Sequence, residues 1–189
     1  DFEAVEKAAR ILSEGGLVAI PTETVYGLAA DADNREAVLA TYAAKGRPAD
    51  HPLIVHVAGP DAIPFWAVDV PPEAWLLVKT YWPGPLTIVL KKSERCGTFV
   101  TGGQDTVALR CPSHPVAHAL LERFAGETHK GLTAPSANTF GRISPSTAAH
   151  VAEDLGLKPE GKLDMILDGG PCELSLIHIS EPTRQAEIS

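Results

Sequence analysis

The sequence predicts an α/β fold built on a mixed β-sheet, and three observations lead to this prediction. Segments with apolar residues at helical spacing alternate with short apolar runs of strand length along the chain. Glycine and proline pairs separate many of these segments. The composition is that of a globular domain, with 44% hydrophobic and 21% charged residues among 189. This length fits one domain, which buries enough surface to fold without a disulfide or a metal.

The first half of the chain is predicted to form two helices and two strands. Apolar side chains recur at helical spacing from Val5 to Leu12, and Gly15-Gly16 end this helix. Asn34 is suited to the N-cap of the second helix because its side chain can accept a backbone N–H. The predicted elements are a helix over 5–12, a strand over 17–20, a helix over 34–44 and a strand over 53–57.

The second half continues the alternation of helices and strands. Pro115 fits the first position of a helix, where its missing N–H costs nothing. Ser146 is the predicted cap of a later helix, and Gly169-Gly170 close the last strand. The predicted elements are a helix over 72–81, strands over 86–90 and 106–110, a helix over 115–124, a strand over 132–134, a helix over 146–155 and a strand over 165–167.

Charge and composition argue against several classes of protein. The net charge of −8 and pI of about 5.3 argue against a protein that coats nucleic acid, although a local basic cleft is compatible with them. No apolar run approaches the roughly 20 residues of a membrane-spanning helix, and the first residues lack the pattern of a signal peptide. We therefore expect a cytoplasmic protein without membrane contact. Its three cysteines are expected to be free thiols, since they form no Cys-x-x-Cys pair.

Two loops between predicted elements carry polar side chains suited to an anion. Lys45 and Arg47 stand two residues apart in a Gly/Pro loop, where they would hold a polyphosphate or form a solvated basic turn. Ser136 and Asn138 follow a short strand and offer a hydroxyl and an amide to ribose or phosphate oxygens, or they cap a turn. Ligands of open α/β sheets bind beyond strand ends, which is where these loops are expected.

Two strand ends carry further candidates. His56 ends an apolar strand, where it is either a core histidine with satisfied hydrogen bonds or a side chain that contacts a ligand. Arg110 ends another, and a buried arginine needs an anion, either a structural carboxylate such as Asp105 or one from a ligand. His114 and His118 stand at metal-ligand spacing, but no third ligand matches, so no metal site is expected. The phosphate-loop, dinucleotide-binding and hydrolase-nucleophile motifs are absent from the sequence.

Six motifs in these regions, within about residues 2 to 173, carry a specific resemblance. They lie at residues 15–28, 44–57, 82–87, 105–110, 134–138 and 167–172. In this order they resemble the YrdC-like family, the L-threonylcarbamoyladenylate synthases. The resemblance implies a twisted mixed sheet flanked by helices, with a deep concave cleft.

The resemblance also implies a nucleotidyltransferase. Family members join L-threonine, bicarbonate and ATP into threonylcarbamoyl-AMP and release pyrophosphate. A partner complex then transfers the threonylcarbamoyl group to tRNA, forming threonylcarbamoyladenosine. ATP is thus expected as a substrate, with Mg²⁺ on its phosphates, and tRNA or RNA contact is compatible with the family. No covalent intermediate is required, which agrees with the missing nucleophile motifs.

The roles of individual residues follow from the matching motifs. The resemblance places threonine near Thr24, His56 and Arg110. Catalysis would rest on the two cations Lys45 and Arg47, because charge neutralisation and alignment dominate transfer at phosphorus. The implied nucleotide-binding residues are Lys45, Arg47, Thr106, Ser136, Asn138 and Ser144.

Two other functions stay open for the sequence. A carbamoyltransferase-type domain of the kind used in hydrogenase maturation shares the fold, but the acylphosphatase and zinc-finger segments of those proteins are not visible here. An RNA-binding module without turnover would use the same basic cleft, and its binding would depend on salt.

The sequence departs from the family pattern after Glu173. Residues 174–184 read as the translation of a transposase sequencing adapter, and 185–189 fit an index read and the bases after it. We therefore expect a YrdC-like domain over 1–173, truncated at its C-terminal end, and a non-native segment over 174–189. The truncated chain is expected to be unstable or nearly inactive, because the family uses residues of the replaced segment.

Overall fold

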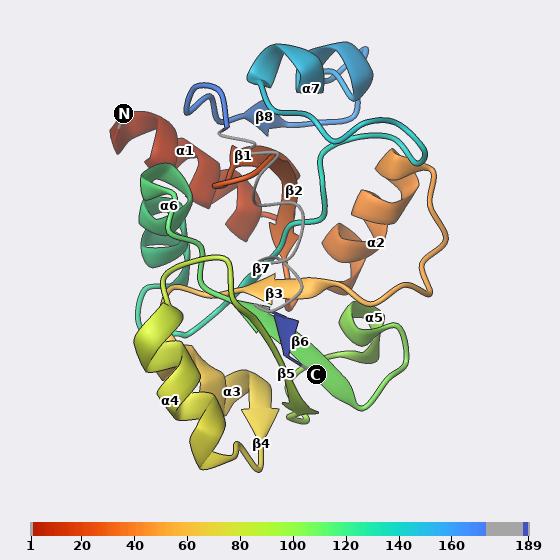
Figure 1. Cartoon of the computed structure of the whole chain (residues 1–189). Coiled ribbons are helices and arrows are strands. Elements are labelled where there is room, and N and C mark those ends of the chain that lie inside the picture. The colour runs from red at the N-terminus through yellow and green to blue at the C-terminus, as the bar shows by residue number, and fades with distance from the viewer. Residues whose placement is uncertain (1, 173–186, 189) are drawn as a thin grey trace.

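The computed structural model describes residues 2–172 and 187–188 as helices around one mixed β-sheet (Figure 1). The helices are α1 (Phe2–Ser13), α2 (Arg35–Lys45), the 3₁₀ helix η1 (Pro60–Ala62), α3 (Ile63–Trp66), α4 (Pro72–Tyr81), α5 (Thr98–Thr101), α6 (Pro115–Ala125) and α7 (Ala148–Asp154). The strands are β1 (Val18–Pro21), β2 (Tyr26–Asp31), β3 (Ile54–His56), β4 (Ala67–Val68), β5 (Thr87–Lys92), β6 (Thr106–Arg110), β7 (Leu132–Thr133), β8 (Met165–Ile166) and β9 (Glu187–Ile188).

The sheet runs in the order β4-β5-β6-β3-β7-β2-β1-β8, with β9 beside β5. Strands β1 and β2 form an antiparallel hairpin in which Pro21 pairs with Tyr26. Strands β3 and β6 are parallel, and their last residues, His56 and Arg110, are partners across the ladder. This mixture of parallel and antiparallel neighbours confirms the predicted fold class.

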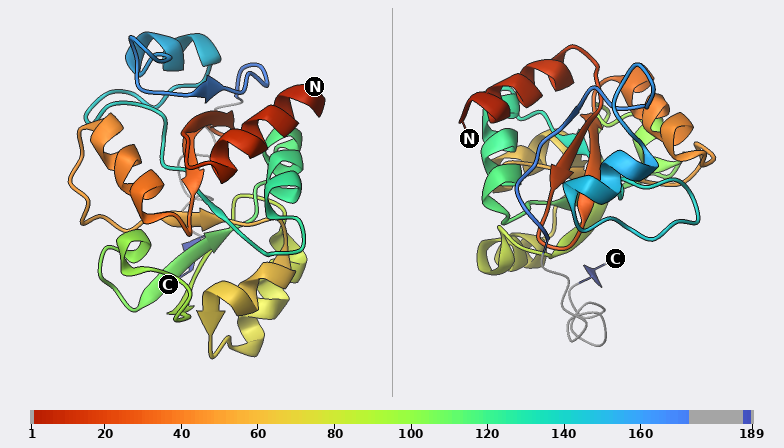
Figure 2. Two further views of the ribbon diagram at one scale, coloured as in Figure 1. Left: turned by 180° about the vertical axis from the view of Figure 1, so that it is seen from behind. Right: turned by 90° about the horizontal axis from the view of Figure 1, so that it is seen from above.

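Helices cover both faces of the β1–β2 end of the sheet. Helices α1 and α6 lie side by side in Figures 1 and 2 and enclose one apolar cluster with Val18 and Ile20. Helices α2 and α7 bury the alternate residues, including Ala19 and Tyr26, on the opposite face. Because side chains alternate across a strand, a strand covered on both faces is apolar throughout, as β1 is.

The β5-β6-β3 end of the sheet is different, because only one of its faces belongs to an apolar cluster. Helices α3 and α4, at the lower end of Figure 1, pack over the inward residues Ile88, Val55 and Leu109. On the other face, Thr106 and Arg110 are half-buried and belong to none of the three clusters. Arg110, at the end of this partly open face, lies next to Glu23 in the loop between β1 and β2.

Most predicted elements are confirmed, and the differences are local. The predicted helix over 72–81 and strand over 106–110 have these bounds in the structure. The cap of α7 is Thr147 rather than the predicted Ser146, since the Thr147 hydroxyl accepts from the His150 N–H. The sequence prediction also missed β2, the turn of helix in α3 and the short strand β4.

The segment expected to be non-native lies mostly outside the described residues. Of residues 174–189, the structure describes β9, whose two residues run parallel to Thr87 and Ile88 of β5. Within the described residues, no helix has the length and apolar character that crossing a bilayer requires.

Candidate active site

Lys45 reaches the loop that contains the other predicted polar residues. It is the last residue of α2, and Gly46 follows in the left-handed conformation at φ 66°, which ends the helix and turns the chain. Its Nζ donates to the carbonyl oxygens of Ser136 and Asn138 at 2.5 and 2.8 Å. The structure therefore brings together two loops that are 91 residues apart in the sequence.

The Lys45 ammonium group is buried and beside another cation. Burial removes hydration from the charge and, together with the nearby Arg47, lowers the pKa of Lys45 to about 8. Asp154 acts in the opposite direction. A buried cation with a lowered pKa gains from an incoming anion, because the anion restores the favourable environment that burial removed.

Arg47 is held by a residue that the sequence analysis did not select. Its Nε donates to Nδ1 of His51 at 2.7 Å, so this ring nitrogen acts as an acceptor and carries no proton. The Tyr42 hydroxyl donates to the backbone carbonyl of His51 and anchors that residue from α2. The arginine and its imidazole partner are four positions apart in the sequence, which keeps the guanidinium close to its own loop.

Asn138 has one polar atom without a partner in the described part of the chain. Its Nδ2 donates to the carbonyls of Thr139 and Arg142, whereas the buried Oδ1 has no hydrogen bond. A buried acceptor without a donor is unfavourable by roughly 1–3 kcal/mol, so a ligand hydroxyl or amine that reaches it would be favoured. Ser144 is half-buried in the following loop, and Thr106 lies on the partly open face of β6.

The hairpin loop between β1 and β2 has a rigid turn. The buried Thr22 hydroxyl donates to the Val25 carbonyl at 2.6 Å, which fixes the loop from inside. Thr24 at the tip is exposed, and its backbone N–H contacts the Thr22 hydroxyl oxygen at 3.4 Å. Thr22 therefore shapes the loop, and Thr24 presents its side chain to solvent.

Arg110 is paired with Glu23 from this hairpin loop. One guanidinium nitrogen, Nη2, lies 2.9 Å from Glu23 Oε1, and Nε donates to the Gly84 carbonyl at 3.2 Å. Of the two anions considered for Arg110, the structure therefore shows a structural carboxylate, and this carboxylate is Glu23 rather than Asp105. Residue 105 precedes β6, whereas the Arg110 side chain lies at the other end of that strand, where the hairpin loop approaches.

His56 is buried next to this ion pair and remains neutral. Burial first, and then the Arg110 charge, lowers the pKa of His56 to about 4. Its Nδ1 has no hydrogen-bond partner among the described residues, so His56 is not the fully satisfied core histidine that was the alternative. His56 and Arg110 are cross-strand partners, which puts both side chains on the same face.

The β1–β2 hairpin connects the two groups of candidate residues. The Leu28 N–H donates to the Pro135 carbonyl, and the Ala137 N–H donates to the Tyr26 carbonyl. Gly27 allows this close approach, since a Cβ there would lie 3.1 Å from the Ala134 backbone oxygen. The loop that carries Glu23 and Thr24 is thus joined to the segment that holds the Lys45 ammonium group.

Glu23 and His51 are the two residues that sequence reasoning missed. The signal for Glu23 was present: it is an acidic side chain inside a motif loop, and the strand-end arginine needed an anion. The pairing was not readable because Glu23 and its partners are about 90 positions apart. His51 could have been found from its position four residues after Arg47 in a proline-flanked loop.

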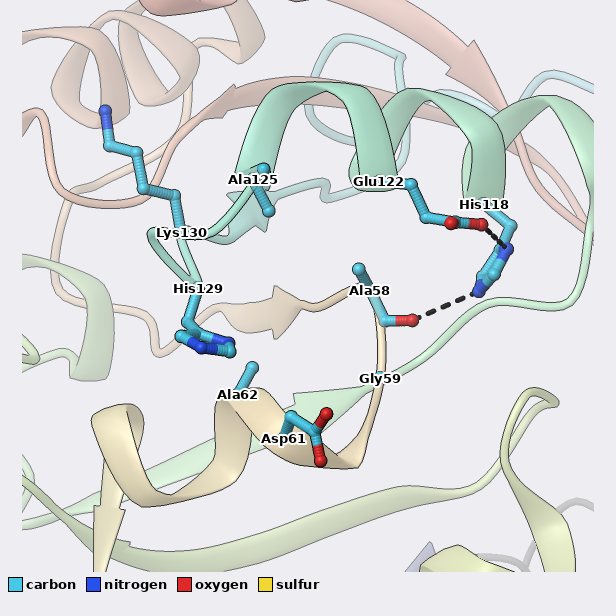
Figure 3. A pocket seen from close by; sticks show the side chains of 10 residues that line it. Ala58, Gly59, Asp61, Ala62, His118, Glu122, Ala125, His129 and Lys130 are labelled. Atoms are coloured by element: carbon cyan, nitrogen blue, oxygen red, sulfur yellow. Dashed lines mark hydrogen bonds and ion pairs between the residues drawn. The ribbon is translucent and has the colours of Figure 1, made fainter.

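His114 and His118, which stand at metal-ligand spacing in the sequence, each have a protein partner in the structure. His114 accepts the Val116 N–H at the start of α6, and His118 lies 2.9 Å from Glu122. Figure 3 shows His118 between Glu122 and the Ala58 carbonyl, at the edge of a hollow of about 280 Å³. Over residues 2–172 and 187–188, no group of three His, Cys, Asp or Glu side chains is placed to hold a metal ion.

A family profile matches this chain over residues 10–179. It is the profile of the Sua5, YciO and YrdC proteins, which carries the description "Telomere recombination". The chain belongs to this family. The matched range includes every candidate site residue named above.

Curated relatives in this family are named threonylcarbamoyl-AMP synthase. The relative from Pyrococcus abyssi is 48% identical over 169 residues, which cover 89% of this chain and 47% of that protein. The relative from Bacillus subtilis is 46% identical over 168 residues, with 88% and 46% covered. The relative from Halorhodospira halophila is 39% identical over 154 residues, with 82% and 78% covered. The chain therefore spans about half the length of the first two relatives.

Solved structures of other proteins have the same fold as this chain. The crystal structure of Pyrococcus abyssi Sua5 complexed with L-threonine superposes with a TM-score of 0.82 at 48% identity, covering 89% of this chain and 47% of that one. The structure of Escherichia coli YciO superposes with a TM-score of 0.77 at 22% identity, covering 92% and 81%. The second likeness concerns the fold alone.

Proposed function

We propose that this chain carries the threonylcarbamoyl-AMP synthase reaction, in which L-threonine, bicarbonate and ATP form threonylcarbamoyl-AMP and pyrophosphate. The observation that carries the proposal is the joining of two groups by one hairpin. One group has the buried Lys45, the half-buried Arg47 and an unpartnered amide oxygen, and the other has an arginine at the partly open sheet face. The names of the relatives at 44–48% identity support the same reaction.

The Lys45 group is suited to the nucleotide. Lys45 at the end of α2 and Arg47 in the following loop supply two positive charges. Phosphate oxygens would replace the two carbonyl oxygens that accept hydrogen bonds from Lys45 Nζ in this structure. Asn138 Oδ1 is available to a hydroxyl or amino donor of the nucleoside. We assign Ser136, Ser144 and Thr106 to the same ligand, because the first two lie on the loop that Lys45 contacts and the third lies on the partly open face.

The Arg110 group is suited to a small amino acid. A guanidinium binds a carboxylate through paired N–H groups, and the neutral His56 beside it has an unpartnered ring nitrogen for a hydroxyl or an ammonium group. Thr24 is exposed at the adjacent loop tip and would contact the same ligand. The L-threonine complex of the Pyrococcus abyssi protein supports threonine as this amino acid.

The chemistry needs alignment and charge neutralisation rather than a nucleophilic side chain. Threonine's amine and bicarbonate give a carbamate and water, and a carbamate oxygen then attacks the α-phosphorus of ATP while pyrophosphate leaves. Negative charge gathers on the phosphates in this step, so the contribution of Lys45 and Arg47 is to hold cations against it. The carbamate is unstable in water, and a site that keeps both ligands together limits its loss.

A divalent ion would belong to the substrate in this proposal. The described residues provide no cluster of three metal-ligating side chains, and Mg²⁺ prefers phosphate oxygens and water. We therefore expect Mg²⁺ to arrive on the ATP phosphates. The product would pass to a tRNA-modifying complex, since a mixed carbamic–phosphoric anhydride is a reactive group donor.

Pyrophosphate release tests the proposal. The gene product is incubated with ATP, and threonine and bicarbonate are each omitted in turn. Release that needs both supports the synthase reaction, and Lys45→Ala is expected to lower it at least about a hundredfold. Release with carbamoyl phosphate in place of both would instead favour a carbamoyltransferase. Salt-sensitive RNA binding by a folded protein that releases no pyrophosphate would favour an RNA-binding module.

A further inference from the structure

The Glu23–Arg110 pair raises a question about how Arg110 binds a ligand. In the proposed function, which this inference rests on, Arg110 holds the threonine carboxylate, yet its guanidinium already faces a carboxylate. Both side chains are largely buried, with 12% of the arginine and 22% of the glutamate exposed. A pair this enclosed either competes with the ligand or prepares the arginine for it.

Glu23 is fixed more firmly than an exchangeable partner would be. Its Oε2 accepts from both the backbone N–H and the hydroxyl of Ser113, each at 2.9 Å, while Oε1 faces Arg110 at 2.9 Å. Burial alone would raise the pKa of Glu23, but Arg110 and the Ser113 donors outweigh it and keep the pKa below its ordinary value. Displacing the carboxylate would break three contacts at once.

Arg110 keeps donors for a ligand while it holds Glu23. A guanidinium has five N–H groups, and Arg110 donates its Nε–H to the Gly84 carbonyl. Its Nη2 lies 2.9 Å from Glu23 Oε1 as an ion pair, without the geometry of a hydrogen bond in the described part of the chain. Both N–H groups of Nη1 and one of Nη2 remain, and one from each of these nitrogens forms the end-on fork that binds a carboxylate through two parallel hydrogen bonds. The hydrogen bond from Nε and the charge contact at Nη2 together restrict the orientation of that fork.

We infer that Glu23 is a positioning residue that holds the Arg110 guanidinium in the plane needed to bind the amino-acid carboxylate. A free arginine side chain has several rotatable bonds, and ordering it has an entropic cost, which the Glu23 contact removes from the binding step. Glu23 also cancels the charge of Arg110, so the site as a whole favours a zwitterionic amino acid over a simple anion. Glu23 itself need not touch the substrate.

The test compares two isosteric variants of the gene product, made with its native C-terminal end, in the pyrophosphate assay. Glu23→Gln keeps the size of the side chain but removes its charge, and Glu94→Gln makes the same change at an exposed loop residue. We expect Glu23→Gln to raise the threonine KM at least about tenfold, to leave the ATP KM within about twofold and to change kcat little. Glu94→Gln is expected to match the parent protein.

A double-mutant cycle separates positioning from a general structural role. In an Arg110→Ala background, Glu23→Gln should have no further effect on the threonine KM, because its contribution passes through the arginine. Glu23→Asp, which retains the charge but falls short of Arg110, should raise the same KM less than Glu23→Gln. If Glu23→Gln fails to fold, Glu23→Asp carries the comparison.

Three results would overturn the inference. A lower threonine KM in Glu23→Gln would mean that the carboxylate competes with the substrate. Equal increases in both KM values would mean a structural role, and an unchanged threonine KM would mean no role. A parent protein that releases no pyrophosphate with threonine would instead refute the proposed function, so the two failures are distinguishable.

Discussion

At the scale of single residues, the proposed function makes nucleotide binding depend on the charge of Lys45. With a pKa of about 8 in the free protein, Lys45 loses its charge as the pH rises from 7 to 9. A polyphosphate favours the protonated form, so its affinity should fall as the pH rises through this window, by up to about tenfold per unit above the pKa. Calorimetric titration with a non-hydrolysable ATP analogue measures this.

Lys45→Arg provides the control for the pH dependence, because arginine stays charged across the same range. This variant is expected to bind the analogue with an affinity that changes little between pH 7 and 9, whatever its absolute value. A parent protein whose affinity is flat over this window would contradict the assignment of the Lys45 charge to the phosphates.

His51 is expected to act through Arg47. His51→Asn places an amide oxygen near the position of Nδ1 and keeps an acceptor for Arg47 Nε, whereas His51→Leu removes it. We expect His51→Leu to raise the ATP KM about tenfold and His51→Asn to raise it no more than about threefold, with the threonine KM unchanged in both. Equal behaviour of the two variants would show that the hydrogen bond to Arg47 is not what matters.

The residue-scale contacts are where sequence reasoning was least complete. The motif loops identified Lys45, Ser136 and Asn138, and the structure brings these three residues together. The partner of Arg110 was not predictable because the hairpin loop and the end of β6 meet only through the sheet. Local spacing carries no information on such a long-range pairing.

At the scale of elements, α2 matters because its last residue is Lys45. The Asn34 side chain caps its first turn by accepting the Ala37 N–H at 3.1 Å. Asn34→Ala leaves this donor without a side-chain acceptor and should lower the free energy of unfolding by about 1 kcal/mol. Asn34→Asp keeps an acceptor and should retain most of the stability that the cap contributes. Urea denaturation measures both, and an Asn34→Ala protein as stable as the parent would show that solvent replaces the cap.

Element prediction succeeded where periodicity or capping was strong and failed where burial was uniform. Helix α4 and strand β6 have clear apolar patterns, and their predicted bounds agree with the structure. Strand β2 is buried at all six positions and contains Gly27 and two alanines, so it shows neither alternation nor strand propensity. Helices η1 and α3 have only three and four residues, which is too short for helical periodicity to show in the sequence.

At the scale of the whole molecule, one face of the sheet and three loops converge on the candidate site. The β1–β2 hairpin crosses from the Arg110 group to the Lys45 group, so the site depends on the order of strands rather than on any single element. Sequence patterns predicted the α/β class from the alternation of elements. The strand order required the structure, because β7 and β2 bring distant segments between β3 and β1.

We propose that residues 174–189 are foreign to the native protein, as their resemblance to an adapter translation indicates. If so, independent sequencing reads of the source gene across the Glu173 codon should diverge from this sequence at that point and continue in the family pattern. Reads that repeat the same codons through residue 189 would contradict the proposal.

The central claim is that the two groups joined by the hairpin combine threonine, bicarbonate and ATP in one reaction. Mass spectrometry of the product, formed by the gene product from ¹³C-bicarbonate, tests it most directly. We predict a nucleotide with the mass of threonylcarbamoyl-AMP that is heavier by one mass unit than the product from unlabelled bicarbonate. AMP alone, or a threonine-containing nucleotide that does not take up the label, would contradict the account.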